Sequence, residues 1–371
     1  MNLKKRPVTP RHIETRFAVF RSLISVVVAL LLSLVLILLV SKEPLVAFKA
    51  FLLGPFESLK NVSNIFQTAA PLIFTGLAVS VMFSCNQFNM GAEGAFFAGG
   101  LAASWIAVSY VLPSGLHPAV AMLCGALVGG IVCGLPALLK VRLGASEIVS
   151  SLMLNYVVLY LGVYFLNYYL LDVNAGFPAT AKFPDSARLE SFIPKASFHA
   201  GILIAFVMVV VIYAFLRRSK YGYAIRMVGQ NEMFSRYSGI AVGSTVCLSQ
   251  VVGGAVAGLG GACEMLGIYS RFQWVALPGY GFDGIIVATL AGNKPALVPI
   301  TALFLAYLRT GADIMSRRSD VATEVLSIVQ GVIILMVAAK LFLQRQMHKQ
   351  MVKNSEKWAE ETEAENGKYS T

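Results

Sequence analysis

Apolar runs long enough to cross a lipid bilayer recur along this chain and limit its fold more than any other feature. The first, from Ser22 to Val40, is about 19 residues long, and a helix needs about 20 to cross a bilayer. Further runs cover residues 64–83, 91–112, 117–139, 147–171, 201–216 and 242–268. Because the bilayer core holds no water to satisfy the backbone, such runs must be helical. We therefore predict an all-α polytopic membrane protein.

The charge content supports membrane insertion. Only 13% of the residues are charged and the mean hydropathy is +0.71, whereas soluble domains carry roughly 25% charged residues. The net charge of +11 does not favour a nucleic-acid partner, because the cations cluster at the ends of apolar runs. Cations in those positions anchor cytoplasmic loops. We expect a lipid bilayer as the surroundings and no nucleic acid.

The same bias sets the topology. Residues 1–21 are basic, so we place them in the cytoplasm, and the nearly neutral stretch 172–197 outside. Segments 276–293, 295–309 and 323–342 bring the count to about ten helices, with both termini cytoplasmic and a polar cytoplasmic tail over 344–371. This count places Arg309 outside, against the bias, so we also consider broken or re-entrant segments there. The membrane domain then covers residues 22–343.

A basic interruption after residue 216 has two explanations. The interruption contains five basic residues and a single acidic one, Glu232. The basic residues are Arg217, Arg218, Lys220, Arg226 and Arg236. Gly229 and then Asn231, a good N-cap, predict a short helix here. Such a helix would be a surface that another protein contacts, whereas a plain charged loop would only anchor the topology.

A sequence similarity between two segments of the chain suggests that its two halves are related. Gly91-Ala92-Glu93-Gly94 and Gly281-Phe282-Asp283-Gly284 match at one constant offset. In the predicted topology the two segments run in opposite directions, as in an inverted repeat, and such repeats place substrate paths near the bilayer midplane. Chance similarity between glycine-rich segments is the alternative.

No motif supports catalysis. The phosphate-binding pattern GxxxxGK[ST], the zinc motif HExxH and a nucleophile elbow are all missing from the sequence. The five cysteines have no metal-ligand spacing. We expect no catalytic or metal-binding residue, and any ATP must be hydrolysed by another chain.

Acids in apolar runs are the candidate polar groups, since burying one near the bilayer centre costs roughly 2.5–3.5 kcal/mol. Glu147 follows Ser146, which predicts an N-capped helix whose dipole Glu147 complements. Glu93 and Asp283 either line a path or cap half-helices.

Polar and aromatic residues deep in the fifth run suggest ligand recognition. We expect Asn155 and Tyr156, with Tyr160 one turn later, to share a face that stacks on a sugar or base. Asn89 completes the candidate path. Glycine pairs such as Gly125/Gly129 and Gly254/Gly258 predict close helix packing.

Four ordered stretches together resemble one family, the permease subunits of bacterial ABC importers for nucleosides and simple sugars, a branched-chain-type permease family. They are FNMGAEG (88–94), GASEIVSSLMLNY (144–156), GQNEMFSRYSGI (229–240) and GYGFDGIIVATLAGNKP (279–295). The family's usual Gln after GAEG is Ala95 here, and Phe234-Ser235 replaces paired alanines. These departures bear on substrate preference and on ATPase pairing.

The resemblance implies a nucleoside permease in the bacterial inner membrane, with a simple sugar as the alternative substrate. It implies ATP-Mg on a separate ATPase subunit, a second and non-identical permease subunit, and an extracytoplasmic substrate-binding lipoprotein. The basic loop becomes the ATPase coupling loop, with Gly229, Asn231, Glu232, Tyr237 and Gly239 as its contact residues. The alternative from another class is an ion-coupled transporter in which Glu93 and Asp283 carry protons.

Overall fold

The computed structural model describes residues 41–190 and 198–321, with isolated positions at 31, 34, 35, 38, 328, 331 and 332. It divides into two compact units, residues 49–314 and the chain on either side of them. The predicted helix over 22–40, the segment 323–342 and the tail 344–371 lie almost entirely outside the described residues.

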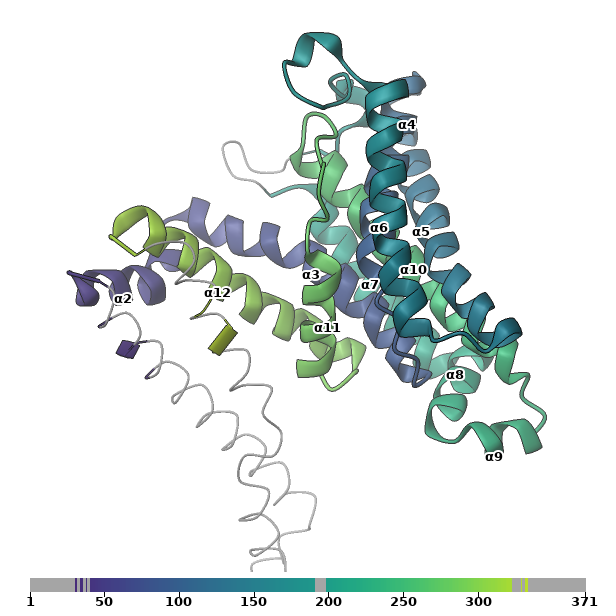
Figure 1. The fold of residues 1–371 in the computed structure, drawn as a ribbon. Coiled ribbons are helices and arrows are strands. Elements are labelled where there is room, and N and C mark those ends of the chain that lie inside the picture. Colours follow the sequence, from purple (N-terminus) through teal and green to yellow (C-terminus); the bar gives the residue numbers. More distant parts are fainter. Residues whose placement is uncertain are drawn as a thin grey trace, which may run out of the picture. The chain divides into compact units, whose positions relative to one another are not determined.

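The prediction of an all-α membrane protein is confirmed for the described residues, seven of whose helices are long and apolar enough to cross a membrane. The elements, drawn in Figure 1, are α2 (Pro44–Leu53), α3 (Leu59–Ser84), α4 (Ala92–Ser109), α5 (Leu116–Leu143), α6 (Glu147–Phe165), α7 (Ala200–Arg218), α8 (Lys220–Gln230), α9 (Glu232–Tyr237), α10 (Val242–Ile268), α11 (Tyr280–Leu290) and α12 (Val298–Arg318). A π-helical turn, η2 (Leu166–Leu170), continues α6.

Glycines allow α4, α5 and α10 to pack side by side, as predicted (Figure 1). A Cβ atom added to Gly129 of α5 would lie 2.4 Å from the carbonyl oxygen of Gly254 in α10. One added to Gly99 of α4 would lie 2.2 Å from the carbonyl oxygen of Gly258. Without side chains at these crossings the backbones themselves are in contact, which forms the tightest part of the unit 49–314.

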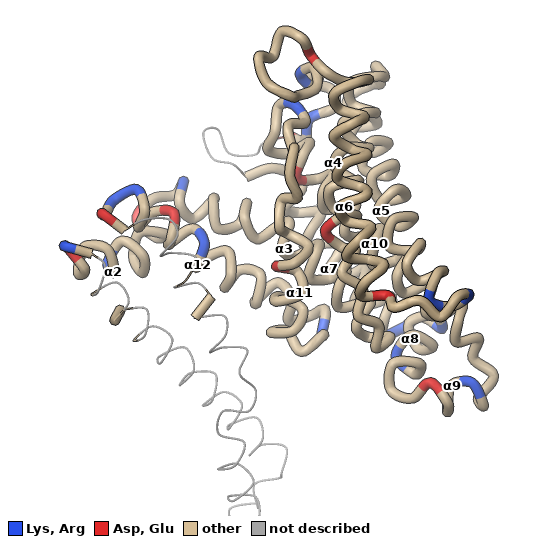
Figure 2. Tube along the Cα trace, in the orientation of Figure 1, with Lys and Arg blue, Asp and Glu red and all other residues tan. Residues whose placement is uncertain are grey.

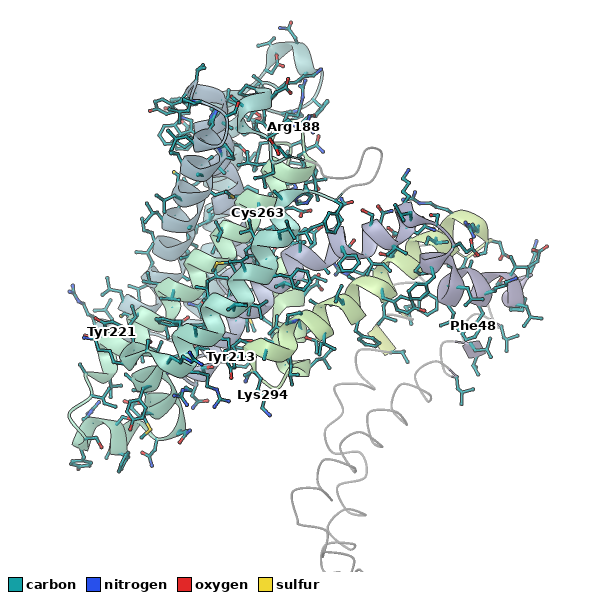
Figure 3. The ribbon with its side chains drawn as sticks, turned by 180° about the vertical axis from the view of Figure 1, so that it is seen from behind. Phe48, Arg188, Tyr213, Tyr221, Cys263 and Lys294 are labelled. Carbon is teal, nitrogen blue, oxygen red and sulfur yellow. The ribbon has the colours of Figure 1, made fainter. Side chains whose placement is uncertain are left out.

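The two ends of this unit differ in charge and in structure. At one end the stretch 172–190 packs on the chain after α10, through the N–H of Thr180 to Phe272 O at 3.0 Å and of Phe183 to Ser270 O at 2.8 Å. Arg188 lies at this end and Tyr221 at the other (Figure 3). A group of Lys and Arg positions gathers around α8 and α9 at the second end (Figure 2).

Two predicted spans differ from the observed helices. The segment 276–293 contains only the 11-residue helix α11, which is too short to cross a bilayer by itself. The segment predicted to end at Arg309 continues to Arg318 as α12, so the placement of Arg309 in an external loop was wrong. The count of about ten helices and the inverted repeat stay predictions.

The other unit is described mainly near residues 41–48 and 315–321. The Asp320 carboxylate accepts hydrogen bonds from Ser41 Oγ at 2.6 Å and from Lys42 N at 2.8 Å. These bonds lower the pKa of Asp320, since they stabilise its charged form. They tie the chain before α2 to the chain after α12.

Candidate functional site

Helix α4 begins inside the bundle and not at its end. The Asn155 side chain, on α6, holds this start: its Nδ2 donates to Met90 O at 3.0 Å, and its Oδ1 accepts from Gly94 N at 2.9 Å. Asn155 lies eight residues beyond Glu147, the first residue of α6, which is about 12 Å along that helix. The N-terminus of α4 therefore lies about a third of the way along the candidate membrane span Glu147–Leu170.

Helix α11 begins at the same place. The N–H groups of Gly279 and Gly281 each donate to the carboxylate of Glu93 at 2.5 Å, and that of Phe282 donates at 3.4 Å. A Cβ atom on Gly281 would lie 2.3 Å from the backbone nitrogen of Glu93, so no other residue fits there. We call this meeting of the two N-termini around Glu93 the half-helix junction.

The carboxylate of Glu93 is fully buried and lies where the positive ends of two helix dipoles meet. Each terminus carries roughly half a positive charge, which a single carboxylate can balance. Of the two roles predicted for Glu93, this geometry provides the contacts of a cap. A role in transport stays a prediction for both Glu93 and Asn155.

Asp283, in the first turn of α11, forms an ion pair with Arg309 of α12. Their side chains are 15% and 32% exposed, so the pair is only partly screened. The pair fastens the short α11 to its neighbour. It also explains how α12 can carry an arginine within its apolar length, since the charge is neutralised locally.

We expect Asp283→Asn to lower the stability of the protein because it leaves the Arg309 charge without its partner. Breaking a fully buried pair costs about 3–5 kcal/mol, and the partial exposure of Arg309 reduces our expectation to about 1–2 kcal/mol. Thermal unfolding in detergent measures the loss. The double variant Asp283→Asn/Arg309→Gln should recover much of it, and a double variant as unstable as the sum of the singles would contradict the pairing.

The other predicted path residues divide into two groups. Asn89 lies beside the junction, where its Oδ1 accepts from Gly91 N at 2.6 Å and its Nδ2 donates to Cys133 O at 3.2 Å. Tyr156 is 48% exposed and Tyr160 70%, whereas Asn155 is buried. The expectation that these three share one face was wrong, because successive residues of a helix are about 100° apart.

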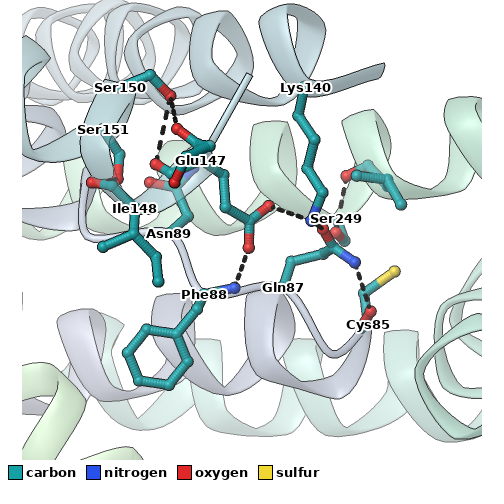
Figure 4. Close-up of polar contacts among 12 residues, drawn as sticks. Cys85, Gln87, Phe88, Asn89, Lys140, Glu147, Ile148, Ser150, Ser151 and Ser249 are labelled. Atoms are coloured by element: carbon teal, nitrogen blue, oxygen red, sulfur yellow. Dashed lines mark hydrogen bonds and ion pairs between the residues drawn. The ribbon is translucent and has the colours of Figure 1, made fainter. Parts of the chain in front are cut away.

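A polar cluster at the α8 end joins the chain after α3 to α5 and α6 (Figure 4). Glu147 accepts a hydrogen bond from Phe88 N and forms an ion pair with Lys140 at 3.0 Å. Lys140 also donates to Gln87. Ser146 makes no side-chain capping bond, so the predicted N-cap was wrong in that detail. Sequence reasoning took Lys140 and Arg142 only as a mark of the cytoplasmic side, and it missed the contacts of Lys140 with Glu147 and Gln87.

The basic loop forms two helices, α8 and α9. Asn231 caps α9 as predicted, since its Oδ1 accepts from Phe234 N at 2.9 Å. Glu232 pairs with Arg236 at 3.4 Å, and Tyr237 is 85% exposed. Gly239 turns the chain after α9 with φ +81°, which favours glycine.

Gly229 has a structural task that its motif did not reveal. A Cβ atom there would lie 2.1 Å from the carbonyl oxygen of Ser84, the last residue of α3. Helix α8 therefore rests directly on the end of α3, just before the segment 85–91 that leads to the half-helix junction. An exposed surface on α9 is thus connected through α8 to that junction.

The described residues contain no group of three or more His, Cys, Asp or Glu side chains that could hold a metal ion. All five cysteines are free thiols.

Comparison with known proteins identifies the chain. Residues 61–338 match the family described as the permease component of the branched-chain amino acid transport system. A guanosine ABC transporter permease protein of Bacillus subtilis is 34% identical over 314 residues, or 82% of this chain and 88% of that protein. A glucose ABC transporter permease protein of Haloferax volcanii is 30% identical over 355 residues, or 93% of each chain. A nucleoside ABC transporter permease protein of Lactococcus lactis is 29% identical over 333 residues, or 87% of this chain and 91% of that protein. With its all-helical membrane bundle and its match over most of the length, this chain belongs to that family of transport-system permease components.

Proposed function

We propose that this chain is the membrane subunit of an ABC importer that moves a nucleoside into the cell. The observation that carries the proposal is the half-helix junction, where α4 and α11 both start within the membrane around Glu93. Transporters build substrate sites from discontinuous helices of this kind. The guanosine and nucleoside permeases among the relatives favour a nucleoside.

ATP hydrolysis would take place on a separate ATPase subunit, with ATP-Mg bound there. The exposed side of α9, with Met233, Phe234 and Tyr237 at its surface, is the contact that we assign to that subunit. A non-identical second permease and an extracytoplasmic binding lipoprotein would complete the importer. This arrangement places the chain in the bacterial inner membrane with both termini in the cytoplasm.

The mechanism that we infer follows the contacts inward from α9. Closure of the ATPase pair would push on α9 and move α8, which rests on Ser84 at the end of α3. The segment 85–91 is bound to Glu147, Ser151 and Asn155. Movement of α3 against these contacts would shift the start of α4 and open the path towards one side or the other.

A simple sugar is the second candidate substrate, because the glucose permease relative matches 93% of each chain. An ion-coupled transporter is less well supported, since Glu93 is already fully engaged by backbone N–H groups. A neutral solute suits both importer hypotheses, because Asp283 and Glu147 are already paired with cations.

Uptake by the whole importer in membrane vesicles tests the function. We expect ATP-dependent uptake of labelled guanosine and not of labelled glucose. Tyr237→Ala should reduce guanosine uptake about tenfold or more without loss of folded protein, because an exposed aromatic anchor often carries much of a contact's energy.

Tyr110→Ala is the matched control, because Tyr110 is 52% exposed and follows the other end of α4. It should leave uptake unchanged. Uptake of glucose alone would replace the nucleoside hypothesis by the sugar hypothesis. Normal uptake by Tyr237→Ala would remove α9 as the coupling surface.

A further inference from the structure

A row of tyrosines runs along the outer face of α6 and η2. Its members, which we call the tyrosine row, are spaced four residues apart and are Tyr156, Tyr160, Tyr164 and Tyr168, with exposed fractions of 48%, 70%, 49% and 73%. The rings of Tyr164 and Tyr168 lie 4.6 Å apart between centroids. This span, Glu147–Leu170, is also the least buried of the seven in the described part of the chain.

Half of the row lies too deep to anchor the protein at the membrane surface. The span has 24 residues, and Tyr156 and Tyr160 are about 14 and 20 Å from its start. The hydrocarbon core is about 30 Å thick, so both lie near its centre. Tyrosine is enriched at the two interfaces of a membrane, and of the row Tyr168 lies nearest to an end of the span.

Lipid is a poor neighbour for these residues. In the described part of the chain the four hydroxyl groups have no hydrogen-bond partner, although the hydroxyls of Tyr280 and Tyr307 do. A hydroxyl buried in hydrocarbon without a partner is costly. Phenylalanine would provide the same ring to lipid without that cost.

Close packing against another helix is also a poor match. Where helices of this chain cross tightly they do so through glycine, as at Gly129 and Gly254. The glycine of α6 itself, Gly162, faces inward, since a Cβ atom there would lie 2.4 Å from the ring of Phe97. The outer face has bulky rings in place of small residues, which keeps a neighbouring helix at a distance.

We propose that the tyrosine row lines a water-accessible lane in which the flat base of a neutral nucleoside stacks on successive rings. This inference rests on the proposed function and specifies its substrate-contacting surface. Aromatic rings stack on any base, and hydroxyls can bond the ribose. The span has no charged residue after Glu147, so nothing in the lane would hold a phosphate.

Thiol labelling tests the lane without relying on transport. We expect Tyr156→Cys and Tyr160→Cys in the whole importer to react with a membrane-impermeant thiol reagent, above the background of the native cysteines. Leu127→Cys is the control, because Leu127 is 62% exposed near the middle of α5 and should stay unreactive in lipid. Guanosine should slow the labelling, and glucose should not.

Ring substitutions test stacking. Tyr156→Leu/Tyr160→Leu should slow guanosine uptake by about tenfold, whereas Tyr156→Phe/Tyr160→Phe should lose much less because the rings remain. Tyr213→Leu is the matched control, since Tyr213 is 44% exposed on α7 and should have no effect. Thermal stability of each variant, measured in detergent, separates misfolding from a transport defect.

The outcomes separate the lane from the function. Guanosine uptake with unreactive cysteines at both positions would overturn the lane and leave the proposed function standing. Reactive cysteines protected by glucose and not by guanosine would overturn base stacking together with the nucleoside hypothesis. Equal uptake by the Leu and Phe double variants would overturn the stacking role of the rings.

Discussion

Alanine at Gly129 should severely weaken the α4–α5–α10 bundle, whereas alanine at Gly134 in the same helix should be tolerated. The added Cβ at Gly129 would lie 2.4 Å from Gly254 O and 2.7 Å from Gly258 Cα. Both are backbone atoms, so no side chain can rotate away. Overpacking a core costs about 1–3 kcal/mol and sometimes more, and we expect Gly129→Ala to reach the top of that range.

Gly134 gives the matched comparison. The contact of its added Cβ is the Cγ2 of Val251 at 2.9 Å, the end of a side chain that can adjust. Alanine also favours a helix over glycine by about 1 kcal/mol, which offsets part of the remaining strain. The yield of folded protein and its unfolding temperature in detergent measure both variants. Equal values for the two would contradict a bundle held by backbone contact at Gly129.

Removal of the Glu93 carboxylate should have the second large effect. In Glu93→Ala the buried N–H group of Gly281 and the partly buried N–H group of Gly279 lose their acceptor, a fully buried carboxylate. Each unsatisfied buried donor costs about 1–3 kcal/mol, out of a total stability of about 5–15 kcal/mol for a typical domain. We expect little folded Glu93→Ala at physiological temperature.

Glu93→Gln separates capping from a role in transport. Glutamine keeps one acceptor oxygen, so its loss of stability should be smaller than that of Glu93→Ala. A cap predicts that uptake of every substrate falls in proportion to the amount of folded protein. Normal stability with a defect that depends on the substrate would show instead that Glu93 acts on the path. Unfolding temperature and uptake of two solutes, measured on the same preparations, distinguish these cases.

The features that the sequence predicted well are those that depend on local pattern. In the described residues, apolar runs of bilayer length form helices, although 276–293 contains only the short α11. Asn231 marks the start of α9 by its capping chemistry. The pair Gly254/Gly258 predicted close packing because only glycine permits backbone contact. The match between residues 91–94 and 281–284 directed attention to the two segments that meet at the junction.

The features that it missed depend on which segments meet in space. The α11 segment has enough apolar residues to suggest a span, but the chain before it is irregular and its Gly279 donates to Glu93. Asn155 and Tyr156 are neighbours in sequence, and only packing reveals that one is buried and the other exposed. The ion pair of Glu147 with Lys140 was not predicted either. The two residues lie on different helices, and the geometry of the turn between α5 and α6 brings them together.

The half-helix junction also bears on what must stay inside the cell. Two helix N-termini that meet would ordinarily attract an anion such as a phosphate. Here the chain supplies the anion itself, since Glu93 already accepts the N–H groups of Gly279 and Gly281. The N–H groups of Gly279 and Gly281 are therefore not available to a phosphate that reached this depth. In the importer that we propose, the junction would therefore offer no phosphate site to a nucleotide, and it would not favour the phosphorylated form of an imported nucleoside.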